Sequence, residues 1–154
     1  MTIFHRRRIC CLFLCLAVAV LTACEPGPEP GSEPGSLEFV DSWVRAAPPG
    51  TQMTAAFGVL QNETDSELEI TAWSSPAYAD VSLHRTEIVE GVSKMREVPV
   101  LVIPAGESVA LAPGGYHLML MMPLQDVESG QSVPLHATTL DGRGFRFEAP
   151  VEGR

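Results

Sequence analysis

Residues 113–122 read PGGYHLMLMM, and this stretch decides the kind of fold that the chain adopts. Pro113-Gly114-Gly115 is a turn signal, and the alternation that follows indicates a β-strand. Side chains at i and i+2 of a strand share a face, so His117 and Met119 point to one face while the intervening leucines point to the other. The stretch therefore predicts a half-buried strand that carries two candidate metal ligands side by side.

Short β-rich runs of the same kind fill the chain from Leu37 onward, with no convincing helix. They lie at about 38–45, 54–61, 67–73, 80–89, 98–103, 107–111, 116–122, 132–140 and 143–149. Turn signals such as Pro48-Pro49-Gly50 and Asp141-Gly142 separate them. Seven to nine short strands separated in this way predict an all-β fold, an antiparallel sandwich or barrel.

The N-terminus has the pattern of an export signal. A basic cluster at 5–8 precedes an uncharged apolar run from 9 to 21, which suits a signal-peptide core better than a membrane span of about 20 residues. The run ends in LTAC at 21–24, which resembles a bacterial lipobox, in which a diacylglyceryl group is attached to the cysteine and cleavage occurs just before it. We expect residues 1–23 to be a lipoprotein signal peptide and Cys24 to be lipidated. An ordinary secretory signal with a chance cysteine is the alternative.

A tether follows the expected lipid site. Residues 25–36 read EPGPEPGSEPGS and offer no apolar side chain to bury. At about 3.1 Å per residue in polyproline II, this stretch reaches roughly 37 Å. We therefore expect residues 24–36 to lift a domain of residues 37–154 off a membrane. A Pro-rich ligand for an SH3-like module is the alternative, and it does not suit a location outside the cytoplasm.

Charge and cysteine content exclude several classes of function. The chain has 10 Lys and Arg against 19 Asp and Glu, a net charge of −9, which is the wrong sign for binding nucleic acid. Removal of residues 1–23 takes away three arginines and no acid, so the mature chain carries 7 basic and 19 acidic residues, a net charge of −12. It also removes every cysteine except Cys24, whose thiol would be alkylated. A disulfide, a thioredoxin-like role and a blue-copper site are therefore excluded.

Histidine and methionine carry the candidate chemistry. His84, Met95, His117 and Met119 follow the spacing H-x10-M-x21-H-x-M, which resembles the signature of the PCuAC family of bacterial envelope copper chaperones. The resemblance covers about Leu37 to Val151. The further segments that look like this family, in the same order, are 41–45 (DSWVR), 48–50 (PPG), 55–57 (AAF), Asn62, 75–76 (SP), 104–107 (PAGE) and 113–120 (PGGYHLML).

The resemblance implies a fold, a cargo and a partner. The fold would be a cupredoxin-like antiparallel β-sandwich with Greek-key connections. The protein would be a Cu(I) metallochaperone of the cell envelope and not an enzyme, anchored by its N-terminal lipid and facing the periplasm or cell exterior. It would deliver copper towards the binuclear copper site of cytochrome c oxidase, beside a Sco-type thiol protein. The four residues of the motif would be the metal ligands.

The ligand types suit this cargo without reference to the family. Thioether sulfur is a soft donor that favours Cu(I), imidazole binds copper well, and neither ligand brings the negative charge that would stabilise Cu(II). Thioethers cannot form disulfides in an oxidising compartment and do not protonate, so only the two imidazoles make the affinity depend on pH. Two histidines and two methionines therefore select the cuprous ion.

Each candidate ligand also has an ordinary structural explanation. His84 alone would be a surface strand residue, and Met95 or Met119 alone would be core filler. Their combined spacing favours metal binding. Met121 continues the face of His117 and could be an auxiliary ligand, although packing is the stronger interpretation.

The remaining candidates have no partner at a matching spacing. His136 and Met53 are therefore interpreted as structural. Trp43 and Trp73 could shield a site, although core packing is the default for a tryptophan in a sandwich.

Two other functions stay open at this point. One is a copper-buffering or copper-resistance protein that has no dedicated acceptor. The other is a copper enzyme with histidine ligands, which is disfavoured because methionines occupy the coordination positions and leave no evident open site or general base.

Overall fold

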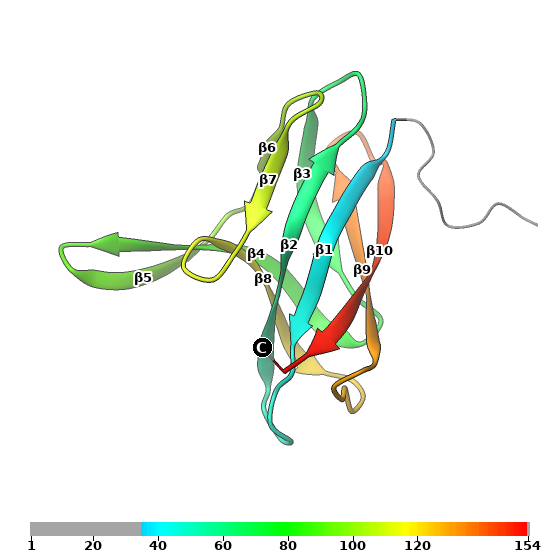
Figure 1. Ribbon diagram of the computed structural model, residues 1–154. Coiled ribbons are helices and arrows are strands. Elements are labelled where there is room, and N and C mark those ends of the chain that lie inside the picture. The colour runs from blue at the N-terminus through cyan, green and yellow to red at the C-terminus, as the bar shows by residue number, and fades with distance from the viewer. Residues whose placement is uncertain (1–34, 154) are drawn as a thin grey trace, which may run out of the picture. The chain divides into compact units, whose positions relative to one another are not determined.

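The computed structural model describes residues 35–153, and in this range the chain forms ten strands and no helix (Figure 1). The strands are β1 (Leu37–Arg45), β2 (Met53–Asn62), β3 (Leu68–Ser74), β4 (Tyr78–Val89), β5 (Val92–Glu97), β6 (Leu101–Ile103), β7 (Ser108–Leu111), β8 (Tyr116–Pro123), β9 (Ser132–Thr139) and β10 (Gly144–Glu152). The predicted all-β class is confirmed. Within the same residues, the structure contains no helix with the length and apolar character needed to cross a membrane.

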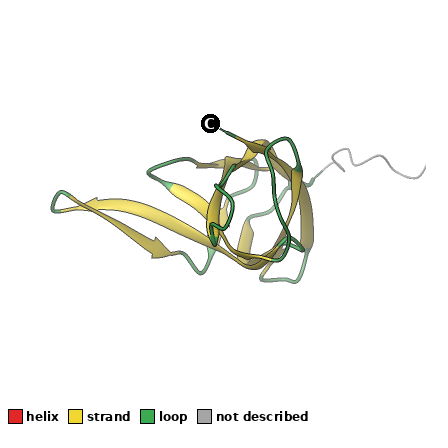
Figure 2. Ribbon diagram, turned by 90° about the horizontal axis from the view of Figure 1, so that it is seen from below, coloured by secondary structure: helices red, strands yellow, loops and turns green. Residues whose placement is uncertain are grey.

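The strands form one sheet that curls around a common interior (Figure 2). They pair in the order β5-β4-β8-β7-β2-β1-β10-β9-β3-β6, and β8 also pairs directly with β2. Most pairings are antiparallel, as predicted. The β1–β10 and β7–β8 contacts are parallel, which the run of strands and turns along the sequence did not indicate.

Alternate residues of the strands fill the interior. Leu83, Leu118 and Leu120 are almost completely buried on β4 and β8, and Ile70 and Leu135 are buried on β3 and β9. Burying each such side chain contributes about 1.5–3 kcal/mol. Because these leucines point inward, the residues between them on β4 and β8 must point to the outer face of the sheet, where the candidate ligands lie.

A bulge in β1 changes which of its residues point inward. Before the bulge the buried residues are odd-numbered, as Phe39 is, and after it the buried residue is Val44. The register shifts between Val40 and Trp43, and Asp41 has a φ of 49°. The bulge therefore turns Trp43 outward.

Gly58 of β2 lies against this bulge. Its φ is 148°, and a Cβ at this position would lie 2.7 Å from the Phe39 ring and 2.8 Å from the Cα atom of Ser42. Two strands can approach this closely only where one of them has no side chain.

Strand β5 corrects the prediction from sequence, which placed a strand at 98–103 and none at 92–97. All six residues of β5 are exposed, and only residues 101–103 of the expected strand form a strand, β6. Strands β4 and β5 are joined by a two-residue turn at Glu90-Gly91, with φ values of 55° and 79°, as in a type I′ turn. The hairpin projects from the body as an arm (Figure 1). Its sequence was missed because an exposed strand has no apolar alternation and glutamate is uncommon at a positive φ.

Asn62, at the end of β2, holds the loops at one end of the body. Its side-chain amide donates hydrogen bonds to the carbonyl oxygens of Ile103 and Pro104 at 2.9 and 3.0 Å. Its side-chain oxygen accepts from the backbone N–H of Thr64 at 3.0 Å. The side chain is buried with these bonds made, so Asn62 and the 104–107 turn form a structural unit.

Candidate metal site

His117 lies near the start of β8 with only 4% of its surface exposed. Its Nδ1 atom lies 3.1 Å from the carbonyl oxygen of Gly115. A carbonyl oxygen can only accept, so Nδ1 carries the proton and Nε2 keeps a free lone pair. The Nε2 atom is buried and has no hydrogen-bond partner. A histidine that binds a metal usually has one ring nitrogen hydrogen-bonded to the protein, while the lone pair of the other nitrogen is available to the metal.

His84 of β4 lies directly opposite His117 in the sheet. The two ring centroids are 6.1 Å apart. The Nε2 atom of His84 lies 3.0 Å from the Ser82 hydroxyl, whereas its Nδ1 atom is buried without a partner. A buried polar atom without a hydrogen bond costs about 1–3 kcal/mol, and a bound cation is one way to satisfy such nitrogens on adjacent rings.

The two methionines of the motif lie on the same outer face. Met119 is two residues after His117 on β8, opposite Ser82. Met95 is on β5, opposite Thr86, which places it diagonally across from His84. Diagonal neighbours in a sheet are within reach of long side chains. The structure thus brings all four predicted ligands to one face of the β5-β4-β8 strip.

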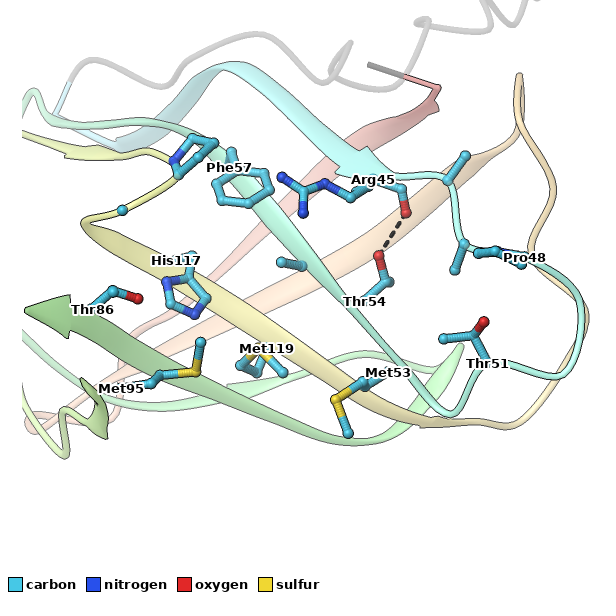
Figure 3. A pocket seen from close by; sticks show the side chains of 15 residues that line it. Arg45, Pro48, Thr51, Met53, Thr54, Phe57, Thr86, Met95, His117 and Met119 are labelled. Atoms are coloured by element: carbon cyan, nitrogen blue, oxygen red, sulfur yellow. Dashed lines mark hydrogen bonds between the residues drawn. The ribbon is translucent and has the colours of Figure 1, made fainter. Parts of the chain in front are cut away.

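A surface cavity of about 370 Å³ opens beside these residues. His117, Met119 and Met95 line one end of it, and the cavity continues along β2 past Met53 (Figure 3). His84 does not line the cavity, although it neighbours His117 in the sheet. Met95 is 52% exposed. The site is therefore reached from solvent on the side where the arm leaves the body.

Aromatic residues from β1 and β2 cover His117 on its other flank. The Phe57 and His117 ring centroids lie 6.3 Å apart, and Trp43 packs on Phe57 at 4.7 Å. The guanidinium of Arg45 lies over the Phe57 ring, 5.2 Å from its centroid. Trp43 thus lies next to the candidate site, whereas Trp73 packs against the core from β3. The position of Phe57 beside His117 could not be predicted from the sequence, because it depends on the pairing of β2 with β8.

The other residues singled out from the sequence fall in different places. Met121 lies one row beyond Met119, between Asp80 of β4 and Met53 of β2. Met53, interpreted as structural from the sequence, is 53% exposed and lines the cavity. His136 lies on β9 between Ser74 and Arg146, in another part of the sheet. Cys24 and the predicted signal and tether lie outside the described residues.

Clusters of the common non-methionine metal ligands are absent from the part of the chain that the structure describes. Among residues 35–153, no three His, Cys, Asp or Glu side chains gather so that they could hold a metal. The side chains that gather at the candidate site are instead two imidazoles and two thioethers. Such a donor set favours soft cations.

Solved structures share this fold. The copper-bound PCuAC domain of PmoF2 matches with a TM-score of 0.64 at 18% identity, covering 80% of this chain and 97% of that one. The Cu(I) form of DR1885 from Deinococcus radiodurans matches with a TM-score of 0.59 at 30% identity, covering 73% and 76%. The expected PCuAC-type, cupredoxin-like β fold is confirmed.

Sequence comparison gives the family. "Putative lipoprotein Lxx21020" of Leifsonia xyli subsp. xyli is 36% identical over 112 residues, and the match covers 72% of this chain and 66% of that protein, so the chain spans about two thirds of its relative's length. Residues 37–151 match the family described as "Putative lipoprotein LpqE-like". The chain therefore belongs to the LpqE-like family.

Proposed function

We propose that this protein is a Cu(I) carrier of the bacterial cell envelope and that His84, Met95, His117 and Met119 hold the ion. The observation that carries the proposal is the pair of buried imidazole nitrogens without hydrogen-bond partners, Nδ1 of His84 and Nε2 of His117, on adjacent rings. Copper would satisfy both atoms at once. The similar domain of PmoF2 has been solved with copper bound and DR1885 with Cu(I), which supports this cargo.

The ligand set suits temporary binding. Four neutral donors leave the charge of the bound ion uncompensated, so Cu(I) is favoured over Cu(II). Three ligands stand on the paired strands β4 and β8, whereas Met95 stands on the exposed arm. Movement of the arm would remove one ligand and leave the others in place. Such a site gives up its ion more readily than a thiolate site, as a carrier requires.

The location proposed for this carrier depends on the N-terminus. A lipid on Cys24 with two acyl chains would anchor the protein stably, and residues 24–36 would tether the domain of residues 37–154. The lipoprotein names of the matching family and relative support an envelope location. Replacing Cys24 by Ser should leave a soluble or an unprocessed form of the protein. A wild-type protein found entirely soluble would contradict the anchor.

The acceptor proposed is the binuclear copper site of cytochrome c oxidase, reached directly or through a Sco-type thiol protein. The function is then transfer and not catalysis. Incubating the copper-loaded protein with an apo oxidase copper domain and with its thiol partner tests this step. Binding without transfer to either would leave the site intact and make the protein a copper buffer or resistance protein.

Competitive Cu(I) titration tests the site itself. His117→Ala and Met119→Ala should each weaken Cu(I) binding at least tenfold, which corresponds to about 1.4 kcal/mol, without unfolding the domain. Met122→Leu is the matched control, because Met122 is exposed and does not line the cavity. Unchanged affinity in the His117 and Met119 variants would refute the site.

A further inference from the structure

Met53 and Met121 form a second pair of thioethers next to the candidate copper site. They lie directly opposite each other on β2 and β8, one row beyond the Ala55–Met119 pair. Residues in direct register have Cβ atoms about 4.5–5.5 Å apart, so both sulfur atoms can reach a common point. Met119 is diagonal to Met53 and lines the same cavity. Three thioethers can therefore converge above this part of the sheet.

We propose that Met53 and Met121, with Met119 shared between the two sites, form a second and weaker site for soft monovalent cations such as Cu(I) and Ag(I). A soft d10 cation accepts two or three sulfur donors, so a complete tetrahedral set is not required. The site has no imidazole and is open to solvent, and both features make it the weaker of the two.

Exposure separates Met53 from ordinary core methionine. Met53 is 53% exposed, whereas a methionine used as filler is buried. The side chain opposite Met119 on β2 is the small Ala55, which leaves room over the sheet between Met119 and Met53. Figure 3 shows Met119 between Met95 and Met53 along the cavity. Sulfur atoms thus follow the cavity from the copper site towards its far end.

The charges around the pair fit a cation. Asp80 of β4 lies directly opposite Met121 on the same face. Arg45 is the one charged residue among those that line the cavity within the described part of the chain, and its guanidinium lies over the Phe57 ring. The row of Asp80, Met121 and Met53 therefore combines two soft donors with a nearby negative charge.

This second site rests on the proposed function for its role. Because Met119 belongs to both groups, an ion could move from the first site to the second by exchanging ligands one at a time. The bonds to imidazole and to Met95 would break as bonds to Met53 and Met121 form, and the ion would stay Cu(I) throughout. The second site would be the point from which an acceptor takes the ion.

Titration of the full chain in detergent with Ag(I), which needs no reductant, tests the inference. With the methionine methyl groups labelled with ¹³C, the first equivalent should shift the signals of Met95 and Met119. The second equivalent should shift those of Met53 and Met121, and Met122 should not move. A single equivalent that shifts only Met95 and Met119, or Met53 and Met121 signals that move no more than that of Met122, would overturn the second site.

Variants separate the two sites. Met53→Leu combined with Met121→Leu should weaken the second equivalent at least tenfold and leave the affinity of the first unchanged, and Met122→Leu should change neither. His84→Ala combined with His117→Ala should weaken the first and keep the shifts of Met53 and Met121. If the first-site shifts are absent in the wild type while those of Met53 and Met121 remain, the proposed function fails and the second site stands. If the double leucine variant binds the second equivalent normally, the second site fails alone.

Discussion

Strands β8 and β5 each supply candidate ligands, but they are held in very different ways. Strand β8 lies between β4 and β2, and its inward residues Leu118 and Leu120 are completely buried. Strand β5 is an edge strand paired only with β4, and all of its residues are exposed. The body thus fixes His117 and Met119, whereas the arm presents Met95 on an element that can move. A site built in this way combines a rigid half with an adjustable half.

The largest expected difference between body and arm is in the free energy of unfolding. Leu118→Ala should lower it by about 3 kcal/mol, because the substitution leaves a cavity in a closely packed interior. Ile88→Ala on the arm should change it by less than about 0.5 kcal/mol, since Ile88 is 78% exposed. Urea unfolding monitored by tryptophan fluorescence measures both. If both substitutions lower the free energy of unfolding equally, the arm unfolds as part of the same cooperative unit as the body.

Two glycines sharpen the same comparison at the level of the backbone. Gly58→Ala should cost about 2 kcal/mol, because its Cβ would collide with the Phe39 ring and the β1 backbone. A Cβ at Gly91, in the turn of the arm, would meet nothing within 4 Å, although the φ of 79° is strained for alanine. Gly91→Ala should therefore fray the arm, seen as faster amide exchange in β5, while the unfolding midpoint stays close to that of the wild type. If the unfolding midpoint of Gly91→Ala falls as far as that of Gly58→Ala, the arm is not energetically separate from the body.

Ligand substitutions compare the rigid half of the proposed site with the adjustable half. We expect His117→Ala to reduce Cu(I) affinity at least tenfold, about 1.4 kcal/mol, and Met95→Leu to reduce it less, because an exposed ligand on a movable arm contributes less to a preformed site. Competition against a chromophoric Cu(I) chelator measures both affinities. A larger loss from Met95→Leu would mean that the arm, and not the body, determines affinity.

The smallest expected effect concerns the turn of the β9–β10 hairpin, which unlike the turn of the arm is held by side chains. The Thr139 hydroxyl, together with Arg143, holds the pKa of Asp141 below its usual value of 3.8. Stabilisation from a carboxyl with a lowered pKa is present above pH 3.8 and is lost as the pH falls through the lower folded value. Asp141→Asn should therefore reduce the loss of stability on acidification below pH 4. Unfolding curves for both proteins at pH 6 and pH 3 test this, and parallel losses would contradict it.

The comparison also explains what the sequence could predict. Strands that pack one face against the core alternate apolar and polar residues, so β1, β2, β8 and β9 were predicted close to their observed bounds. Strand β5 has neither face buried in the core, so no alternation marks it, and it was missed. The parallel β1–β10 contact joins two ends of the domain that are distant in sequence, and no local pattern reports such a contact.

The sequence by itself determined the all-β class, the four candidate ligands and the shared face of His117 and Met119, because the two-residue period of a strand fixes which side chains lie together. Only the tertiary structure decided the partners of those ligands. The register placed His84 against His117, brought Phe57 beside them, and paired Met53 with Met121. Hydrogen bonding then left one buried nitrogen free on each imidazole. Strand pairing connects residues far apart in the chain, and its energy comes from packing and burial that no single segment contains.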